Sequence, residues 1–180
     1  RPYLSLSDWE KYNTLLTKQE EIKWNNKVKE FRGTVANHIL DIKYEQNPQQ
    51  RQSLALHYLR KLNEDPMFWE LGYEATVGFR NDLYAMATQD VVFAQKDDGE
   101  VFKKLNKARY NKELTQQDIM EASPFLTQST WESFLDALIK QDEELAKAEQ
   151  DRINEELRLT AEEEKEAKEA RVSYYNDELG

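Results

Sequence analysis

The sequence predicts an all-α fold, arranged as an elongated array of long antiparallel helices. Its 180 residues contain only 5 glycines and 4 prolines, too few for the many turns of a β-protein. Apolar residues recur every three or four positions along most of the chain, which places them on one side of a helix. A stretch near the N-terminus also returns 122 positions later, so we expect a degenerate loop–helix repeat.

The first half of the chain is expected to contain two helices and the start of a third. The first helix spans about 7–44, where apolar residues step by three or four. Asn47-Pro48 ends it and leads into a second helix over 49–62. Asp65-Pro66 then forms a turn that also caps the next helix, with proline at the first helical position.

The next segment is rich in apolar side chains. Residues 67–96 are therefore expected to form the third and most buried helix. Asp97-Asp98-Gly99 ends it, because these residues favour a turn. Short helices follow at 101–108 and 116–122, and a last long helix covers about 129–171.

The repeated stretch, which we call the motif, covers residues 1–22 in its first copy and 123–144 in its second. Serines and acidic residues near the start of each copy are typical of a helix N-terminus, where side-chain oxygens accept hydrogen bonds from unpaired N–H groups. Identical or similar residues coincide at an offset of 122: Pro2 with Pro124, Leu4 with Leu126, Ser7 with Ser129, Trp9 with Trp131, Glu10 with Glu132, Tyr12 with Phe134, Leu16 with Leu138, and Lys18-Gln19 with Lys140-Gln141. The packing anchors of the repeat are expected to be Trp9, Tyr12, Leu16, Trp131, Phe134 and Leu138.

A second, shorter signal is also repeated. Tyr110-Asn111-Lys112-Glu113-Leu114 precedes the second motif, and Tyr175-Asn176-Asp177-Glu178-Leu179 resembles it near the C-terminal end. Because both signals occur in the same order, we expect two unequal units, residues 1–122 and 123–180. The sequence opens on Arg1, inside the first motif, so we interpret it as a processed product or a segment of a longer protein.

The last predicted helix changes character along its length. Residues 141–171 contain 12 acidic and 6 basic side chains, which accounts for most of the formal charge of −10. Pairs four positions apart, such as Glu164 and Lys168, would support an exposed helix. Two interpretations stay open: a fully solvated helix, or a helix whose apolar stripe is completed by a neighbouring subunit. The candidate interface in the second case is Leu145, Ile153 and Leu157.

Composition argues against several kinds of partner and site. A charge of −10 argues against nucleic acid or an anionic membrane as the main partner, since both are bound by clustered Lys and Arg. No apolar run approaches the roughly 18 residues that a spanning helix needs. The absence of cysteine excludes disulfides and thiolate sites. Asp97-Asp98-Gly99-Glu100 fails as a calcium loop, because Gly99 at the invariant position would make Ala94 and Leu105 the first and last ligands.

No pattern in the sequence indicates catalysis. His38 and His57 lack a neighbouring acid–nucleophile signature. We expect His38 to be partly buried and hydrogen-bonded, and His57 to lie near a helix–helix seam. The carboxylates nearest to aromatic residues are explained by positions on helix surfaces; these are Glu64, Glu70 and Glu74. We therefore predict a protein that is not an enzyme, with no catalytic, cofactor-binding or metal-binding residue.

The order of these signals resembles the internal core, or ejection, proteins of short-tailed T7-like bacteriophages. A Leu-x-x-x-x-Trp sequence opens a long helix rich in Glu, Gln and Lys, an Asn-Pro-Gln-Gln-Arg helix start and a Glu-Asp-Pro turn follow, and a second loop–Trp–helix unit comes after them. The resemblance extends over about two thirds of the chain. It is carried by Leu4, Trp9, Leu15, Asn47-Pro48, Glu64-Asp65-Pro66, Asn111 to Asp118, and Leu126 to Leu138.

This resemblance implies a structural virion protein that stacks in a ring inside the capsid, on the portal axis. Such proteins leave with the genome and reassemble as part of a conduit across the host envelope. The implied partners are further copies of the chain and other core or portal proteins, with no membrane insertion from this segment. DNA would pass without sequence-specific binding, because an acidic lining repels phosphate.

One alternative fits the same sequence. A cellular coiled-coil or spectrin-like interaction module, located in the cytoplasm, would bind a protein partner through the helix that begins near Ser129. Both hypotheses describe an elongated helical segment that assembles with other chains.

Overall fold

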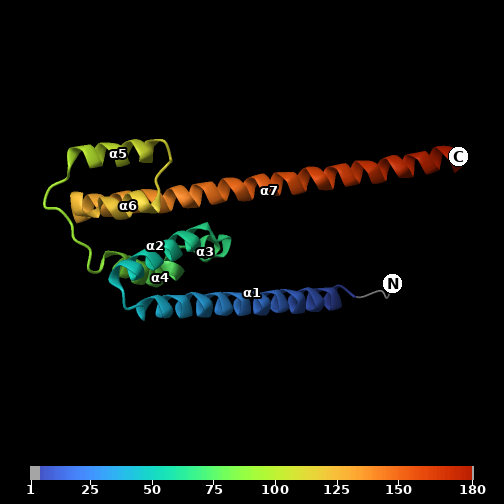
Figure 1. The fold of residues 1–180 in the computed structure, drawn as a ribbon. Helices are drawn as coiled ribbons and strands as arrows, with labels where there is room; N and C mark the ends of the chain where they lie inside the picture. The colour runs from blue at the N-terminus through green and yellow to red at the C-terminus, as the bar shows by residue number, and fades with distance from the viewer. Residues whose placement is uncertain (1–4, 180) are drawn as a thin grey trace.

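The computed structural model describes residues 5–179, and every regular element within them is a helix (Figure 1). The all-α class predicted from the sequence is therefore confirmed. In chain order the elements are α1 (Leu6–Lys43), α2 (Pro48–Glu64), α3 (Pro66–Leu71), α4 (Tyr73–Thr88), α5 (Gly99–Tyr110), α6 (Gln116–Ala122), the 3-10 turn η1 (Ser123–Phe125) and α7 (Gln128–Leu179).

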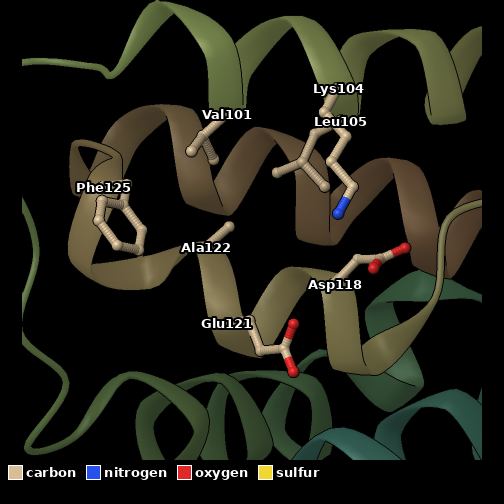
Figure 2. Close-up of a pocket in the computed structure, with 7 residues that line it drawn as sticks. All are labelled: Val101, Lys104, Leu105, Asp118, Glu121, Ala122 and Phe125. Atoms are coloured by element: carbon tan, nitrogen blue, oxygen red, sulfur yellow. The ribbon is translucent and has the colours of Figure 1, made fainter.

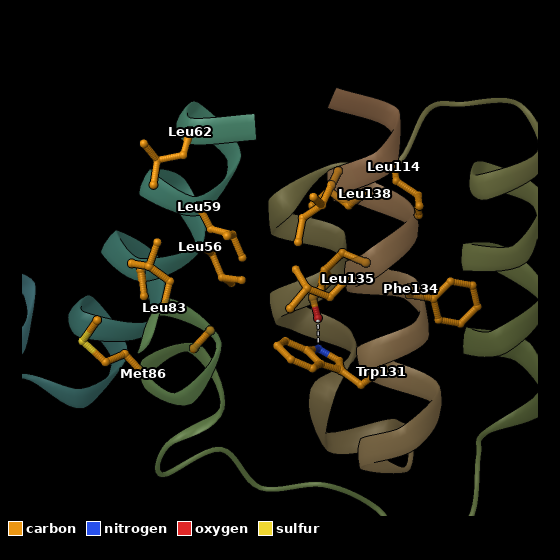
Figure 3. Packing of buried hydrophobic residues seen from close by; sticks show 14 of the residues in the cluster. Leu56, Leu59, Leu62, Leu83, Met86, Leu114, Trp131, Phe134, Leu135 and Leu138 are labelled. Carbon is orange, nitrogen blue, oxygen red and sulfur yellow. Dashed lines mark hydrogen bonds between the residues drawn. The ribbon is translucent and has the colours of Figure 1, made fainter. Parts of the chain in front are cut away.

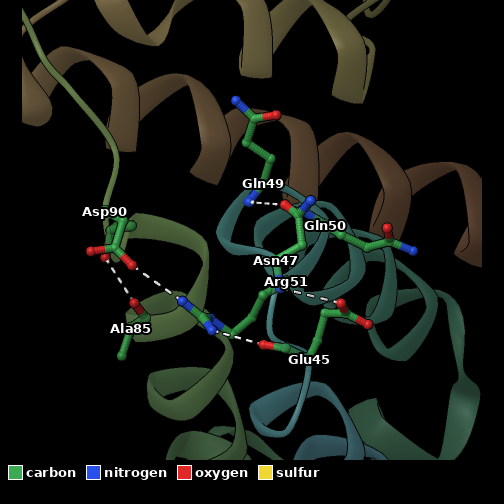
Figure 4. A network of polar contacts seen from close by, with 8 residues as sticks. Glu45, Asn47, Gln49, Gln50, Arg51, Ala85 and Asp90 are labelled. Carbon is green, nitrogen blue, oxygen red and sulfur yellow. Dashed lines mark hydrogen bonds and ion pairs between the residues drawn. The ribbon is translucent and has the colours of Figure 1, made fainter.

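Local capping chemistry fixes where the helices begin. The Asn47 side chain accepts hydrogen bonds from the N–H groups of Gln49 and Gln50 and so caps α2, with Pro48 at the first helical position. The turn that precedes α2 is tied to the end of α4 (Figure 4). There Arg51 donates to the backbone carbonyl of Glu45 at 2.8 Å and pairs with the Asp90 carboxylate at 3.1 Å.

Both copies of the motif begin a helix at equivalent positions. The Ser5 hydroxyl accepts from the Asp8 N–H at 3.2 Å at the start of α1. The Thr127 hydroxyl accepts from the Thr130 N–H at 3.3 Å at the start of α7. Ser5 and Thr127 are 122 positions apart, as are Asp8 and Thr130, so the repeated sequence produces the same capped helix start twice.

The core is built around α2, α4 and α7, and α5 and α6 pack on α7 (Figure 3). The C-terminal half of α1 packs on α2 and α4 through Val35, Ile39 and Ile42. Fully buried side chains of the centre include Leu56, Leu59, Phe68, Leu83, Leu105, Ile119, Leu126, Trp131, Phe134, Leu135 and Leu138. The unit boundary predicted at 122/123 lies between α6 and η1, inside this core.

The prediction of one helix over 67–96 is wrong in two places. Gly72 separates α3 from α4 with φ 83° and ψ 167°, a conformation that essentially only glycine adopts. The helix then ends at Thr88, and the residues up to Asp98 run along the turn before α7. The N–H groups of Ala94 and Asp98 donate to the carbonyls of Leu126 and Phe125, both at 2.8 Å. This pairing with a distant loop outweighs the helical spacing of the apolar residues.

Both long helices project from the core. In Figure 1 they leave it in the same direction, so the first turns of α1 and the last turns of α7 lie at the same end of the described structure. Every residue of 6–27 in α1 is exposed, as is every residue of 151–178 in α7. At 1.5 Å per residue these stretches extend about 33 Å and about 42 Å. We call them the free α1 stretch and the free α7 stretch.

Candidate assembly surface

The free α1 stretch carries large apolar side chains in water. Trp9 is 45% exposed, Tyr12 is 50% exposed and Leu16 is 40% exposed, with Trp9 and Tyr12 in edge contact at 6.1 Å between ring centroids. The packing role expected for these three residues is therefore not met within the described chain. The reason is geometric: α1 reaches the core only beyond residue 27, so its first six turns have no neighbouring helix.

The second copy of the motif has the opposite environment. Trp131, Phe134 and Leu138 are at most 1% exposed. The Trp131 indole N–H donates to the carbonyl of Ile119 in α6 at 2.8 Å (Figure 3). The rings of Phe134 and of Phe102 in α5 lie 5.6 Å apart in an edge contact. The helices α5 and α6 therefore form a cradle that holds the second motif.

Gln141 closes this cradle through two hydrogen bonds. Its side-chain amide oxygen accepts from the N–H of Leu114, and its NH₂ group donates to the carbonyl of Leu114, both at 3.0 Å. Both residues are buried, so the side-chain amide satisfies two backbone groups that water does not reach. Sequence reasoning did not single out Gln141 as a site residue. The available signal was its identity with Gln19 at the offset of 122.

The segment before α5 is fixed to the start of α7. The Asp97 carboxylate accepts from the N–H of Thr127 at 2.8 Å and from the hydroxyl of Thr130 at 2.7 Å. These hydrogen bonds, the one from the Thr127 N–H above all, hold the pKa of Asp97 below its ordinary value. Asp97 and Asp98 thus serve the loop and the α5 cap, respectively.

The base of the free α7 stretch is joined to α2 by an ion pair. Arg60 donates two hydrogen bonds to the Asp142 carboxylate, at 2.9 and 3.0 Å. Asp142 is only 4% exposed, and its hydrogen bond raises the pKa of Arg60. Just beyond this pair a shallow depression between α2, α3 and α7 includes Leu145 and Ile153 in its lining. Two of the three predicted interface residues therefore border one hollow.

Further along, α7 is a charged, exposed rod. Leu157 is 63% exposed, and all its neighbours on the free α7 stretch are exposed too. The free α7 stretch carries 10 acidic and 5 basic side chains. Arg152 and Arg158 each pair with two glutamates three or four positions away. Such exposed pairs contribute a few tenths of a kcal/mol each, so they support the helix without fixing its surroundings.

A second hollow lies between α5 and α6 (Figure 2). Its floor is apolar, formed by Val101, Leu105, Ala122 and Phe125, and charged side chains stand at its rim. It is a surface groove of the cradle itself.

The residues considered for chemistry do not form a cluster. His38 is exposed, not partly buried as expected, because the buried stripe of α1 runs through Val35 and Ile39. His57 is also exposed, next to the buried Leu56 of α2. The His38 ring packs on Tyr58 with 5.0 Å between centroids. Glu64, Glu70 and Glu74 are exposed on helix surfaces. Within residues 5–179, no group of three or more His, Asp or Glu side chains could hold a metal ion.

The last findings concern membrane-spanning helices and similarity to known proteins. Among the described residues, no helix is both long enough and apolar enough to cross a membrane. No protein family model, curated protein or solved structure matches this chain. The two free stretches and the cradle are therefore the features from which a function has to be inferred.

Proposed function

We propose that this chain is a structural, oligomeric scaffold that assembles through its two free helical stretches. One observation carries the proposal: both stretches leave the core and expose large apolar side chains over tens of ångströms. Most helical stability in proteins comes from packing an apolar face, and neither free stretch packs on another helix within residues 5–179. Neighbouring subunits would provide that packing, in an array of antiparallel helices built from repeated units.

The proposed setting is the internal core of a short-tailed, T7-like bacteriophage particle. There the chain would form part of a ring or tube, in contact with further copies of itself and with other core or portal proteins. It would lie in the virion interior and reach the host cell envelope on infection. The sequence resemblance supports this setting, and the proposal assigns the chain no catalytic residue, cofactor or metal.

The charge of the free α7 stretch supports a role in genome delivery. An excess of five negative charges on one exposed rod produces a field that repels phosphate. In a tube wall this rod would keep DNA from adhering while it slides, without sequence-specific contacts. Apolar residues of the same helix, Ile153 and Leu157, would face the neighbouring subunit.

Sedimentation velocity over a range of concentrations tests the assembly. Ile153 and Leu157 are four positions apart and share one side of α7, whereas Leu159 lies on another side and is also exposed. We expect the double variant Ile153→Ser/Leu157→Ser to shift the chain toward monomer, with Leu159→Ser as the matched control that keeps the oligomer. A wild-type chain that stays monomeric at all concentrations would contradict the proposal.

The alternative function is a cytoplasmic coiled-coil or spectrin-like module. The exposed length of α7 also favours this hypothesis, since one partner helix could pack along it. The same sedimentation experiment separates the two: a module stays monomeric until its protein partner is added, whereas a scaffold self-associates.

A further inference from the structure

The second motif presents two adjacent sides of α7 to two different neighbours. Trp131, Phe134 and Gln141 contact the cradle of α5, α6 and the loop between them. Asp142 faces α2, where it pairs with Arg60. Leu138 follows Trp131 by seven positions and so lies on the cradle side, and Leu135, seven positions before Asp142, lies on the α2 side together with Ile139.

When the two motifs are aligned at the offset of 122, the residues on the cradle side are alike, whereas the apolar residues on the α2 side differ. On the cradle side Trp131, Phe134, Leu138 and Gln141 correspond to Trp9, Tyr12, Leu16 and Gln19, so each residue is repeated in kind. On the α2 side the buried Leu135 and Ile139 correspond to the polar Asn13 and Thr17. Asp142 corresponds to the acidic Glu20, so the first motif keeps the surface that binds a cradle and lacks only the apolar side chains that pack on α2.

We infer that the first motif is a docking surface for a helical hairpin of the α5–α6 type, supplied by a further repeat of this chain's own unit. The inference rests on the proposed assembly role and names the partner for the free α1 stretch. In the docked state Trp9 would donate its indole N–H to a backbone carbonyl, as Trp131 does to Ile119. Gln19 would pair with both backbone groups of one residue in an extended turn, as Gln141 does with Leu114.

The chain contains a second copy of the segment that Gln141 recognises. Leu114 is the last residue of Tyr110-Asn111-Lys112-Glu113-Leu114, and four of these five residues recur at 175–179. The docking side chains are thus repeated, whereas residues 175–179 lie within α7 and repeat the Leu114 segment in sequence only. The repeated cradle side of the motif, together with the recurrence of the Leu114 segment in the sequence, indicates that the same pairing occurs between successive units.

The offset also defines the test. Ser123 corresponds to Arg1, so a copy of residues 99–122 placed directly before Arg1 of the full chain puts a second cradle in register with the first motif. Because this cradle is tethered, its effective concentration is in the millimolar range. Hydrogen exchange of the backbone amides of residues 9–19 reports docking, and exchange of 131–141 reports that the core stays folded.

We expect the tethered cradle to slow exchange over residues 9–19 by about tenfold or more relative to the unextended chain. In the extended chain, Trp9→Ala and Gln19→Ala should each remove this protection, whereas Trp24→Ala, a matched change on α1 outside the repeat, should leave it. Exchange that stays within about twofold of the unextended chain, with 131–141 still protected, would overturn the inference. Dimerisation of the unextended chain through Trp9, without protection in the extended chain, would also overturn it while leaving the scaffold role intact.

Discussion

Gln141 and Gln19 occupy equivalent positions in the two motifs, but only Gln141 is buried and hydrogen-bonded to Leu114. Substituting each of them tests how strongly these hydrogen bonds stabilise the fold. The Gln141→Ala substitution removes both hydrogen bonds to Leu114 and leaves a buried N–H and a buried carbonyl without partners. An unpaired buried polar group costs about 1–3 kcal/mol. Because two such groups lose their partners, we expect a total loss of about 2–6 kcal/mol in the free energy of unfolding.

The equivalent substitution Gln19→Ala is the matched control. Gln19 lies on the free α1 stretch, fully within solvent, so its loss should change the free energy of unfolding by less than about 0.5 kcal/mol. Urea unfolding followed by tryptophan fluorescence measures both variants. A Trp9→Phe/Trp24→Phe background leaves Trp69 and Trp131, both in or at the core, as the reporters.

The unfolding free energies of these two variants can also refute the role assigned to Gln141. If Gln141→Ala and Gln19→Ala change the unfolding free energy by the same small amount, then the amide clamp on Leu114 contributes nothing and the cradle is held by apolar packing alone. A changed denaturant dependence in either variant would show an altered unfolded or native ensemble, and exchange of the Leu114 N–H would then decide.

The other predictions concern backbone, charge and pH. Gly72→Ala should lower the free energy of unfolding by about 1–3 kcal/mol, because alanine rarely adopts the φ and ψ of this residue. Gly33→Ala should raise it by up to about 1 kcal/mol, because Gly33 lies inside α1 with open space where a Cβ would be. Thermal unfolding compares the two variants, and equal effects would contradict the assigned conformations. Asp142→Asn should lower the free energy of unfolding by about 1.5–3 kcal/mol, because it weakens the pair with Arg60. In a double-mutant cycle with Arg60→Gln, the double variant should lose less than the sum of the two single losses. Additive losses would mean that the two residues are not coupled. The pKa of Asp97 is lowered in the folded state, so its contribution to stability is present above its unfolded pKa and is lost as the pH falls through its folded pKa. Urea midpoints measured from neutral to acidic pH should therefore fall less steeply in Asp97→Asn than in the wild type, and identical slopes would show that Asp97 does not titrate with folding.

The helix starts could be predicted because their chemistry is local. Asn47, Asp65 and Asp98 all cap helices where the sequence indicates a turn, and the two motif copies begin α1 and α7 at equivalent residues. Each of these caps depends on atoms within about three residues of the helix start, so the sequence window contains the whole interaction.

The breaks in the predicted third helix and the fate of the two motifs depend on distant contacts. Nothing near Phe93 in the sequence shows that its ring packs 5.5 Å from Trp131, or that Ala94 pairs with Leu126. Trp9 and Trp131 also show the effect of distant contacts. They occupy equivalent positions in two helices that start alike, yet Trp9 is 45% exposed and Trp131 is fully buried. The difference arises from α5 and α6, which only one of them contacts.

Assembly through the free helices is the central claim, and native mass spectrometry of the purified full chain tests it most directly. Measurements at low and high ionic strength separate apolar contacts, which persist in salt, from contacts between exposed charges, which are screened. We predict one discrete closed oligomer under both conditions. A strict monomer at both ionic strengths, at concentrations up to the solubility limit, would contradict the scaffold and favour the partner-binding module.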